Sequence, residues 1–240
     1  MGIISIMTWN TGMTEWTKEN YAERFDKVVN QIKEHLEKEN SIAFLQQVPY
    51  KMKVESLWSV HPYFKELQKR FSEPKCKMFY NDTFNDGYII MMTIAIVANK
   101  GGNEDGAVSA NEKIYPNSEP TNRECAILYK NLNILGIHAK NGEDNKRYLE
   151  MLNSQADIIL GDFNAGNYKE AENRFTFNSI LQEHICICNT PTRIDPRSKR
   201  RTCIDHVFIR EEDVTKCAYL VVHEEVTFSD HFPITFEVII

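Results

Sequence analysis

Short apolar runs, separated by turn residues, constrain the fold of this chain more than any other feature. The runs are rich in β-branched residues and predict strands over 3–9, 41–48, 76–80, 87–99, 125–129, 132–137, 157–160, 185–188, 203–209, 218–223 and 233–239. Apolar residues at helical spacing predict helices over 22–36, 62–71, 143–154 and 176–181. Many strands with a few interposed helices indicate two packed sheets with helices outside, in a single domain over residues 1–240.

Polar side chains stand at the ends of six of these runs. They are Asn10, Gln47, His138, Asp162 with Asn164, Asp205 with His206, and Asp230 with His231. Strand ends project side chains into loops, where functional sites form. Hard oxygen ligands bind Mg²⁺ or Mn²⁺, and a histidine paired with an aspartate can take a proton from water. Hydrolysis of a phosphodiester needs both functions. Taken singly, most of these residues are better explained as turn, cap or core residues, but the whole set in this order and spacing favours a functional site.

The sequence resembles the endonuclease/exonuclease/phosphatase superfamily from residue 6 to residue 238. Six motifs carry the resemblance: Thr8-Trp9-Asn10, Leu45-Gln46-Gln47, Gly136-Ile137-His138, Gly161-Asp162-Phe163-Asn164, Ile204-Asp205-His206 and Ser229-Asp230-His231-Phe232-Pro233-Ile234. The resemblance implies an α/β fold of four layers, in which two packed, mostly antiparallel sheets are flanked by helices. It also implies a metal-dependent phosphodiester hydrolase.

The resemblance implies a catalytic role for each of five matched residues. His231 corresponds to the general base that activates water, and Asp205 to the carboxylate that orients it. Asp162 is the alternative partner of the base. Asn164 corresponds to a hydrogen-bond donor to the scissile phosphate, and His138 to a second histidine that faces the phosphate.

The metal positions implied by the resemblance fall on Asn10, Gln47 and Asp230, with Mg²⁺ or Mn²⁺ as the cofactor. Gln47 stands where the family motif has a glutamate. A neutral amide is a poorer Mg²⁺ ligand than a carboxylate, so we predict weak metal binding and a reduced rate. Three explanations compete: an introduced replacement of glutamate, which we favour, a natural enzyme with a weaker site, or a nucleic-acid-binding relative without catalysis.

A basic loop over 190–202 bears on the substrate. Residues 190–193 and 201–205 are similar to the endonuclease domains of non-LTR retrotransposons, which nick DNA. Arg193 and Arg201 are predicted to bind the nucleic-acid backbone, since guanidinium groups bind phosphate in a forked geometry. A solvated charged loop is the alternative reading of this segment. We therefore predict a nuclease with DNA favoured over RNA, and a small-molecule or lipid phosphoesterase as the alternative.

Composition limits the class of protein and its surroundings. A net charge of -6 argues against a protein that coats nucleic acid by charge alone. The six cysteines lack the Cys-x-x-Cys spacing and are predicted to be buried thiols in a reducing compartment. The sequence shows neither a signal-like apolar segment nor a run of membrane-spanning length. We therefore expect a cytoplasmic monomer without a membrane partner.

Overall fold

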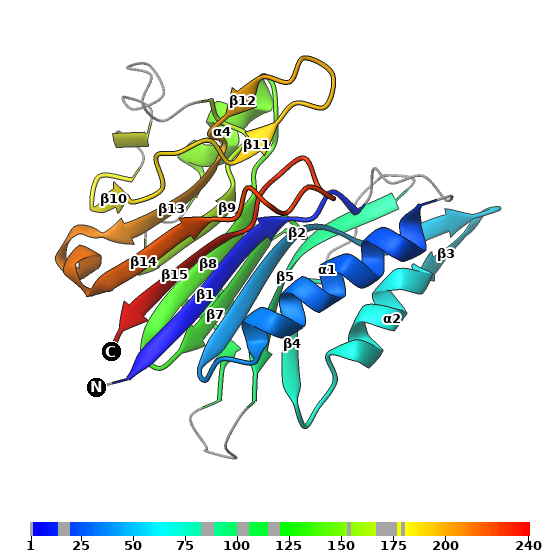
Figure 1. The fold of residues 1–240 in the computed structure, drawn as a ribbon, viewed down its shortest axis with the longest axis horizontal. Coiled ribbons are helices and arrows are strands. Elements are labelled where there is room, and N and C mark those ends of the chain that lie inside the picture. Colours follow the sequence, from blue (N-terminus) through cyan, green and yellow to red (C-terminus); the bar gives the residue numbers. More distant parts are fainter. Residues whose placement is uncertain are drawn as a thin grey trace.

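The computed structural model describes residues 2–13, 20–82, 89–99, 106–114, 121–152, 155–166, 177–178 and 181–240. Two mixed β-sheets pack face to face in this part of the chain, and helices lie on their outer faces (Figure 1). The predicted α/β sandwich is therefore confirmed. No helix in these ranges is both long enough and apolar enough to cross a membrane.

The first sheet contains both termini of the described chain. Its strands follow the order β14 (Cys217–Val222), β15 (Ile234–Ile239), β1 (Ile3–Asn10), β2 (Ser41–Val54), β5 (Ile89–Ala98) and β4 (Cys76–Tyr80), with β3 (Leu57–Val60) also paired to β2. β1 and β2 run parallel, and the other described pairs of this sheet are antiparallel.

The second sheet is built from the middle and later parts of the chain. Its order is β10 (His184–Cys186), β13 (Asp205–Arg210), β9 (Ile158–Asp162), β8 (Leu132–His138), β7 (Glu124–Tyr129) and β6 (Val108–Ser109). Here β8 and β9 run parallel, and the other described pairs are antiparallel. A separate small hairpin pairs β11 (Arg193–Ile194) with β12 (Arg201–Thr202).

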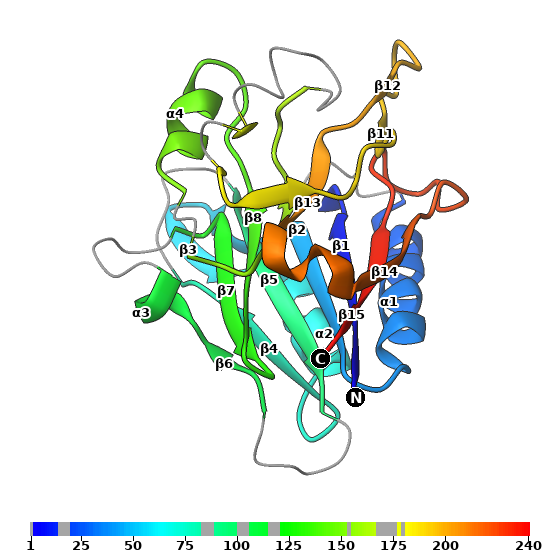
Figure 2. The same ribbon diagram turned by 90° about the vertical axis from the view of Figure 1, so that its left-hand side faces the viewer.

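Three apolar layers hold the sheets and helices together. Helices α1 (Tyr21–Leu36) and α2 (Pro62–Arg70) cover the outer face of the first sheet, and a second cluster fills the space between the sheets. A third cluster packs the outer face of the second sheet against α4 (Asp144–Glu150) and the short α3 (Asn111–Ile114). Figure 2 shows α1 and α4 on opposite sides of the paired sheets.

The alternation of side chains along β1 shows why this strand sits at the centre. Ile4 and Ile6 face the second sheet, whereas Met7 and Trp9 pack in the layer under α1. The two sheets come very close at Gly136, where an added Cβ would lie 2.3 Å from Cδ1 of Phe44. A side chain at this position would push the sheets apart, so glycine is required there.

Several sequence-based predictions about connections are wrong or fall outside the described ranges. The strand predicted to stop before Pro49 continues to Val54. Its pairing with β5 shifts register between Leu45 and Val48 and again between Pro49 and Lys51, so the proline, which has no N–H, lies between two irregularities of the ladder. The end of β2 forms a hairpin with β3, and the predicted loop over 190–202 contains β11 and β12. A 3-10 helix η2 (Glu211–Lys216) was also not predicted. The predicted helix over 176–181 lies largely outside the described residues.

The prediction that the cysteines are buried free thiols is confirmed for five of the six, and one tight turn has the backbone typical of a hairpin. All six cysteines are free, and all except the half-buried Cys217 are buried. Lys130 and Asn131 join β7 to β8 with φ of 48° and 66°, which is the left-handed backbone of a two-residue hairpin turn.

Candidate active site

Strand pairing brings three predicted site residues into one row, where neighbouring inner strands of the second sheet begin or end. The parallel register of β8 and β9 places His138 beside Asp162. β13 runs in the opposite direction, so its first residue, Asp205, pairs with Asp162 from the other side. We call His138, Asp162 and Asp205 the strand-end row.

Residues of the first sheet meet this row from across the sandwich. Asn10 ends β1, and its Nδ2 donates a hydrogen bond of 2.7 Å to Oδ2 of Asp162. His231 precedes β15, and its carbonyl oxygen accepts a bond of 3.0 Å from Nε1 of Trp9. Ser229 Oγ donates to the Asn10 carbonyl at 3.0 Å and accepts from the His231 N–H at 3.2 Å. These bonds fix His231 relative to the strand-end row.

Asp205 and His231 form a buried hydrogen-bonded pair. Nδ1 of His231 lies 3.0 Å from Oδ1 and 2.9 Å from Oδ2 of Asp205. Oδ2 also accepts a bond of 2.7 Å from Oγ1 of the fully buried Thr192, a residue that the sequence did not single out. Burial lowers the pKa of His231, but the charges of Asp205 and then of Asp162 and Asp230 outweigh it and raise this pKa to about 9.

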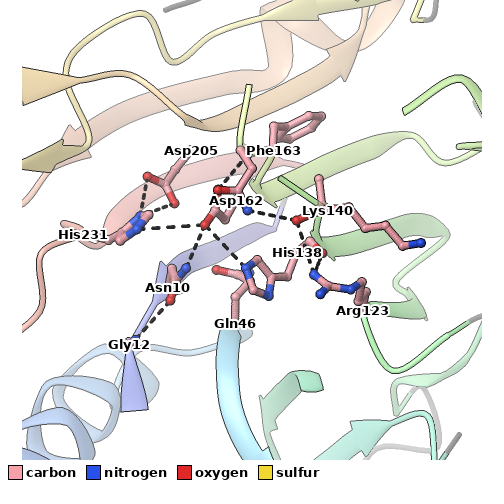
Figure 3. Close-up of polar contacts among 12 residues, drawn as sticks. Asn10, Gly12, Gln46, Arg123, His138, Lys140, Asp162, Phe163, Asp205 and His231 are labelled. Carbon is pink, nitrogen blue, oxygen red and sulfur yellow. Dashed lines mark hydrogen bonds and ion pairs between the residues drawn. The ribbon is translucent and has the colours of Figure 1, made fainter. Parts of the chain in front are cut away.

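Asp162 lies between two imidazole rings, as Figure 3 shows. Its Oδ2 is 3.9 Å from Nε2 of His231 and 3.8 Å from Nε2 of His138. Burial, and then the charge of Asp205, raise the pKa of Asp162 to about 6. Burial, followed by the positive charges of Arg123 and His231, lowers the pKa of His138 to about 3. At neutral pH the two histidines therefore differ in charge, with His231 protonated and His138 neutral.

The turn after β9 holds Asn164 against the same carboxylate. Gly161 has φ of 130°, and a Cβ there would lie 2.1 Å from the carbonyl oxygen of Ile137, so the close approach of β8 and β9 requires glycine. The Asn164 N–H donates to Asp162 Oδ1 at 2.8 Å. Its Nδ2 donates to the carbonyl of Ala139 at 2.9 Å, so the amide predicted to contact phosphate is bonded to backbone in this structure.

A cavity of about 290 Å³ opens next to these residues. The predicted site residues in its lining are Gln47, His138, Asp162, Asn164, Arg193, Asp230 and His231. Asn10 and Asp205 stand behind this lining and contact Asp162 and His231. Arg201 lies outside the lining, where its guanidinium pairs with the exposed side chain of Glu224.

Arg123 also lines the cavity and was missed in the sequence. Its Nη1 donates to the carbonyls of His138 at 3.1 Å and Ala139 at 3.3 Å, and no carboxylate in the described part of the chain pairs with it. In the sequence, Arg123 could have been identified as a site candidate by its position just before the predicted strand at 125–129. In the structure this strand pairs antiparallel with β8, which ends at His138. Arg123 therefore adds a fixed positive charge to the cavity wall.

The residues predicted to hold Mg²⁺ are engaged by other protein groups in this structure, which weakens their fit to the ion. The Oδ1 atom of Asn10 accepts the Gly12 N–H at 3.0 Å, and Gln47 is neutral. Asp230 Oδ2 accepts a bond of 2.8 Å from Nε of Arg193. Among these three residues only Asp230 offers a carboxylate, and Mg²⁺ is usually bound through one or two carboxylates together with water and substrate phosphate.

A second group of potential ligands lies deeper. Asp162, Asp205 and His231 offer ligand atoms that all lie within 4.8 Å of one another, which is close enough to hold one metal ion. Nδ1 of His231 is already bonded to Asp205, so such an ion would use Nε2, the ring nitrogen available for proton transfer. This group therefore serves either metal binding or proton transfer through His231.

Comparisons with solved structures show what this arrangement resembles. The endonuclease domain of TRAS1, a telomere-specific non-LTR retrotransposon, has a TM-score of 0.60 and 16% identity over 99% of both chains. The 3'-5' exonuclease NExo from Neisseria meningitidis has a TM-score of 0.63 and 17% identity over 98% of this chain and 99% of its own. An endonuclease/exonuclease/phosphatase family protein from Leptotrichia buccalis has 0.61 and 18%, over 99% of this chain and 100% of its own.

The sequence comparisons give no match that would add to this likeness. No family model matches the sequence, and no curated protein matches it either. The likeness extends over nearly the whole chain in each of the three structures, at identities that establish the fold. This chain therefore has the fold of the endonuclease/exonuclease/phosphatase proteins.

Proposed function

We propose that this chain is a hydrolase that cleaves phosphodiester bonds in nucleic acid, with DNA favoured over RNA. The observation that carries the proposal is the buried Asp205–His231 pair, with Nδ1 bonded to the carboxylate at 2.9 Å and Nε2 3.9 Å from Asp162 at the cavity. A carboxylate on one ring nitrogen fixes the orientation of the imidazole and leaves the other nitrogen to exchange a proton.

In the proposed reaction one cavity residue activates water and others bind the phosphate. In its unprotonated form, His231 accepts a proton at Nε2 from a water molecule, the water oxygen bonds to phosphorus, the bond from phosphorus to the leaving oxygen breaks, and solvent protonates the leaving oxygen. Arg123 and Arg193 supply positive charge beside the phosphate, since guanidinium groups bind phosphate oxygens through charge-assisted bonds. The neutral His138 faces the same space and can donate a hydrogen bond.

Nucleic acid is the proposed substrate for two reasons. Two of the similar structures are described as an endonuclease domain and a 3'-5' exonuclease. The hairpin of β11 and β12 also brings the basic segment over 193–201 next to the cavity through Arg193. We also propose that the chain acts as a monomer.

Cleavage assays with matched histidine variants test the proposal. Labelled single- and double-stranded DNA and RNA are incubated with wild type, His231→Asn and His223→Asn, each with Mg²⁺, with Mn²⁺ and with EDTA. His223 is the control because it bonds Glu225 and Thr235 and is not part of the cavity lining. We expect His231→Asn to lose roughly 100-fold or more of the rate, the usual contribution of a general base, and His223→Asn to keep it.

Two outcomes would contradict the proposal. Cleavage that survives His231→Asn unchanged would remove His231 from the reaction. Intact nucleic acids together with hydrolysis of a nucleotide or a phosphoinositide would favour the small-molecule or lipid phosphoesterase instead.

A further inference from the structure

Two of the residues predicted to hold metal, Gln47 and Asp230, line the cavity together with Arg193, and this part of the lining is here called the metal corner. The metal corner contains a cation that belongs to the protein. We infer that Arg193 is the resident cation of the metal corner and gives a bound phosphate the positive charge that the resemblance assigns to a divalent ion. The part of this inference that concerns weak metal binding depends only on the contacts of Arg193, Asp230 and Gln47 and does not require the proposed function. The inference about phosphate rests on the proposed function and deepens it.

The contacts of Arg193 hold its guanidinium at this corner. Its Nε donates to Oδ2 of Asp230 at 2.8 Å, and the two side chains are 28% and 21% exposed. The backbones are joined as well, because Arg193 forms an antiparallel bridge with His231 and the Ile194 N–H donates to the Asp230 carbonyl at 2.9 Å. The arginine is therefore tied to the segment that carries both Asp230 and His231.

The charge balance of the corner disfavours a divalent ion. The cavity lining contains the carboxylates of Asp162 and Asp230 and the guanidinium groups of Arg123 and Arg193, and the amide of Gln47 is neutral. The formal charges of these four charged groups sum to zero, and a metal ion that approached Oδ2 of Asp230 would meet the guanidinium of Arg193. A guanidinium has five N–H donors, and the bond to Asp230 uses one, so others are available to phosphate oxygens in the cavity.

Gln47 fits this arrangement. The β2 bulge places it in the cavity lining with φ of 55°, together with Arg193 and Asp230. A carboxylate at position 47 would complete a ligand set for a metal that Arg193 already excludes. We therefore interpret Gln47 and Arg193 as a matched pair, which favours a natural site over an introduced replacement.

Titration with Mn²⁺, followed by the loss of its free electron paramagnetic resonance signal, tests the inference without any substrate. The variants are Arg193→Ala, Arg193→Lys, Gln47→Glu and the double variant Gln47→Glu/Arg193→Ala, with Arg201→Ala as a control arginine from the same hairpin. We expect Arg193→Ala to bind Mn²⁺ roughly tenfold more tightly than wild type or better, since one unit charge a few ångströms away is removed. The double variant should bind most tightly, and Arg193→Lys and Arg201→Ala should resemble wild type.

Two results of the titration would overturn the inference. One is unchanged Mn²⁺ affinity in Arg193→Ala with the fold intact by circular dichroism. The other is Mn²⁺ binding that His231→Asn abolishes and Arg193→Ala leaves alone, which would place the ion at Asp162, Asp205 and His231. If Arg193→Ala does not fold, Arg193→Gln takes its place in the comparison with Arg193→Lys.

Binding of a fluorescent single-stranded oligonucleotide in EDTA tests the phosphate contact. We expect wild type to bind without metal, Arg193→Ala to bind roughly tenfold more weakly or worse, and Arg193→Lys to lie between them. Equal affinity of wild type and Arg193→Ala would overturn this part. Because the Mn²⁺ titration contains no substrate, its outcome is independent of whether the chain proves to be a hydrolase.

Discussion

Thr192 offers a sharp test of how the Asp205–His231 pair is held. The fully buried hydroxyl donates to Oδ2 of Asp205 at 2.7 Å and accepts the N–H groups of Ile204 at 3.3 Å and Asp205 at 3.1 Å. Thr192→Val replaces this hydroxyl with a methyl group of similar size, so the change removes hydrogen bonds and leaves the packing nearly intact.

The expected cost of Thr192→Val follows from the charge of the acceptor. A hydrogen bond to a charged group contributes about 1.5–3 kcal/mol, and the two backbone N–H groups also lose their acceptor, so we expect a total loss of about 3 kcal/mol. Thr11→Val is the matched control, because the equally buried Thr11 hydroxyl donates at 3.0 Å to the neutral carbonyl of Gln46. Its cost should be about 1 kcal/mol.

Urea unfolding of the two variants and wild type measures both costs. For a chain of this length, the predicted loss in Thr192→Val corresponds to a fall in Tm of roughly 6–12 °C. Thr192→Ser, which keeps the hydroxyl, should recover most of the stability. Equal costs for Thr192→Val and Thr11→Val would refute the reasoning, because the charge on Asp205 would then add nothing to the bond.

Three further predictions concern backbone strain and pH. Gly161→Ala should lower the free energy of unfolding by several kcal/mol, measured by chemical denaturation, because its Cβ would lie 2.1 Å from a carbonyl oxygen of β8. The control Gly142→Ala meets no atom within 4 Å and should lower it by only about 1–2 kcal/mol, because of its φ of 64°. His35 is buried, and burial lowers its pKa to about 4. The unfolded chain therefore takes up a proton first as pH falls below about 6.5, and stability should drop by up to roughly 3 kcal/mol between pH 6.5 and 4. In His35→Gln this part of the drop should disappear from urea midpoints measured across that range. Finally, since the pKa of His231 is about 9 and a base must be unprotonated, the cleavage rate should rise with pH up to about 9. Asp205→Asn removes the charge that raises this pKa most, so its profile should rise at lower pH with a smaller maximum, and a wild-type profile that is flat from pH 6 to 9 would contradict the assignment.

The strands, and the polar residues at their ends, could be predicted from the sequence because each depends on local pattern. His138, Asp162 and Asp205 each adjoin an apolar run, and such runs are strands whichever partners they find. The row itself depends on register, since a shift of one residue would turn Asp162 away from its neighbours. That register is a property of paired backbones and is not visible in any single run.

The contacts of the metal corner could not be predicted because they join separate segments. Arg193 and Asp230 are 37 residues apart and meet through a short bridge outside the main sheets. The prediction for Gln47 rested on a motif, whereas its place in the cavity lining accompanies a register shift in β2 between Leu45 and Val48, just before Pro49. A proline in a run of apolar residues predicts the end of a strand, so the register shift could not be predicted from the sequence.

The pairing that forms the strand-end row has a practical consequence for protein engineering. Backbone hydrogen bonds between β8, β9 and β13 hold the backbone of the row, and Thr192 and Arg193 are the residues next to the cavity rim that also contact Asp205 or His231 directly. The hairpin over 193–202 can therefore be randomised in a library, with Arg193 and Thr192 kept, while the reacting groups retain their spacing. Such a library would select new cleavage preferences from a constant catalytic frame.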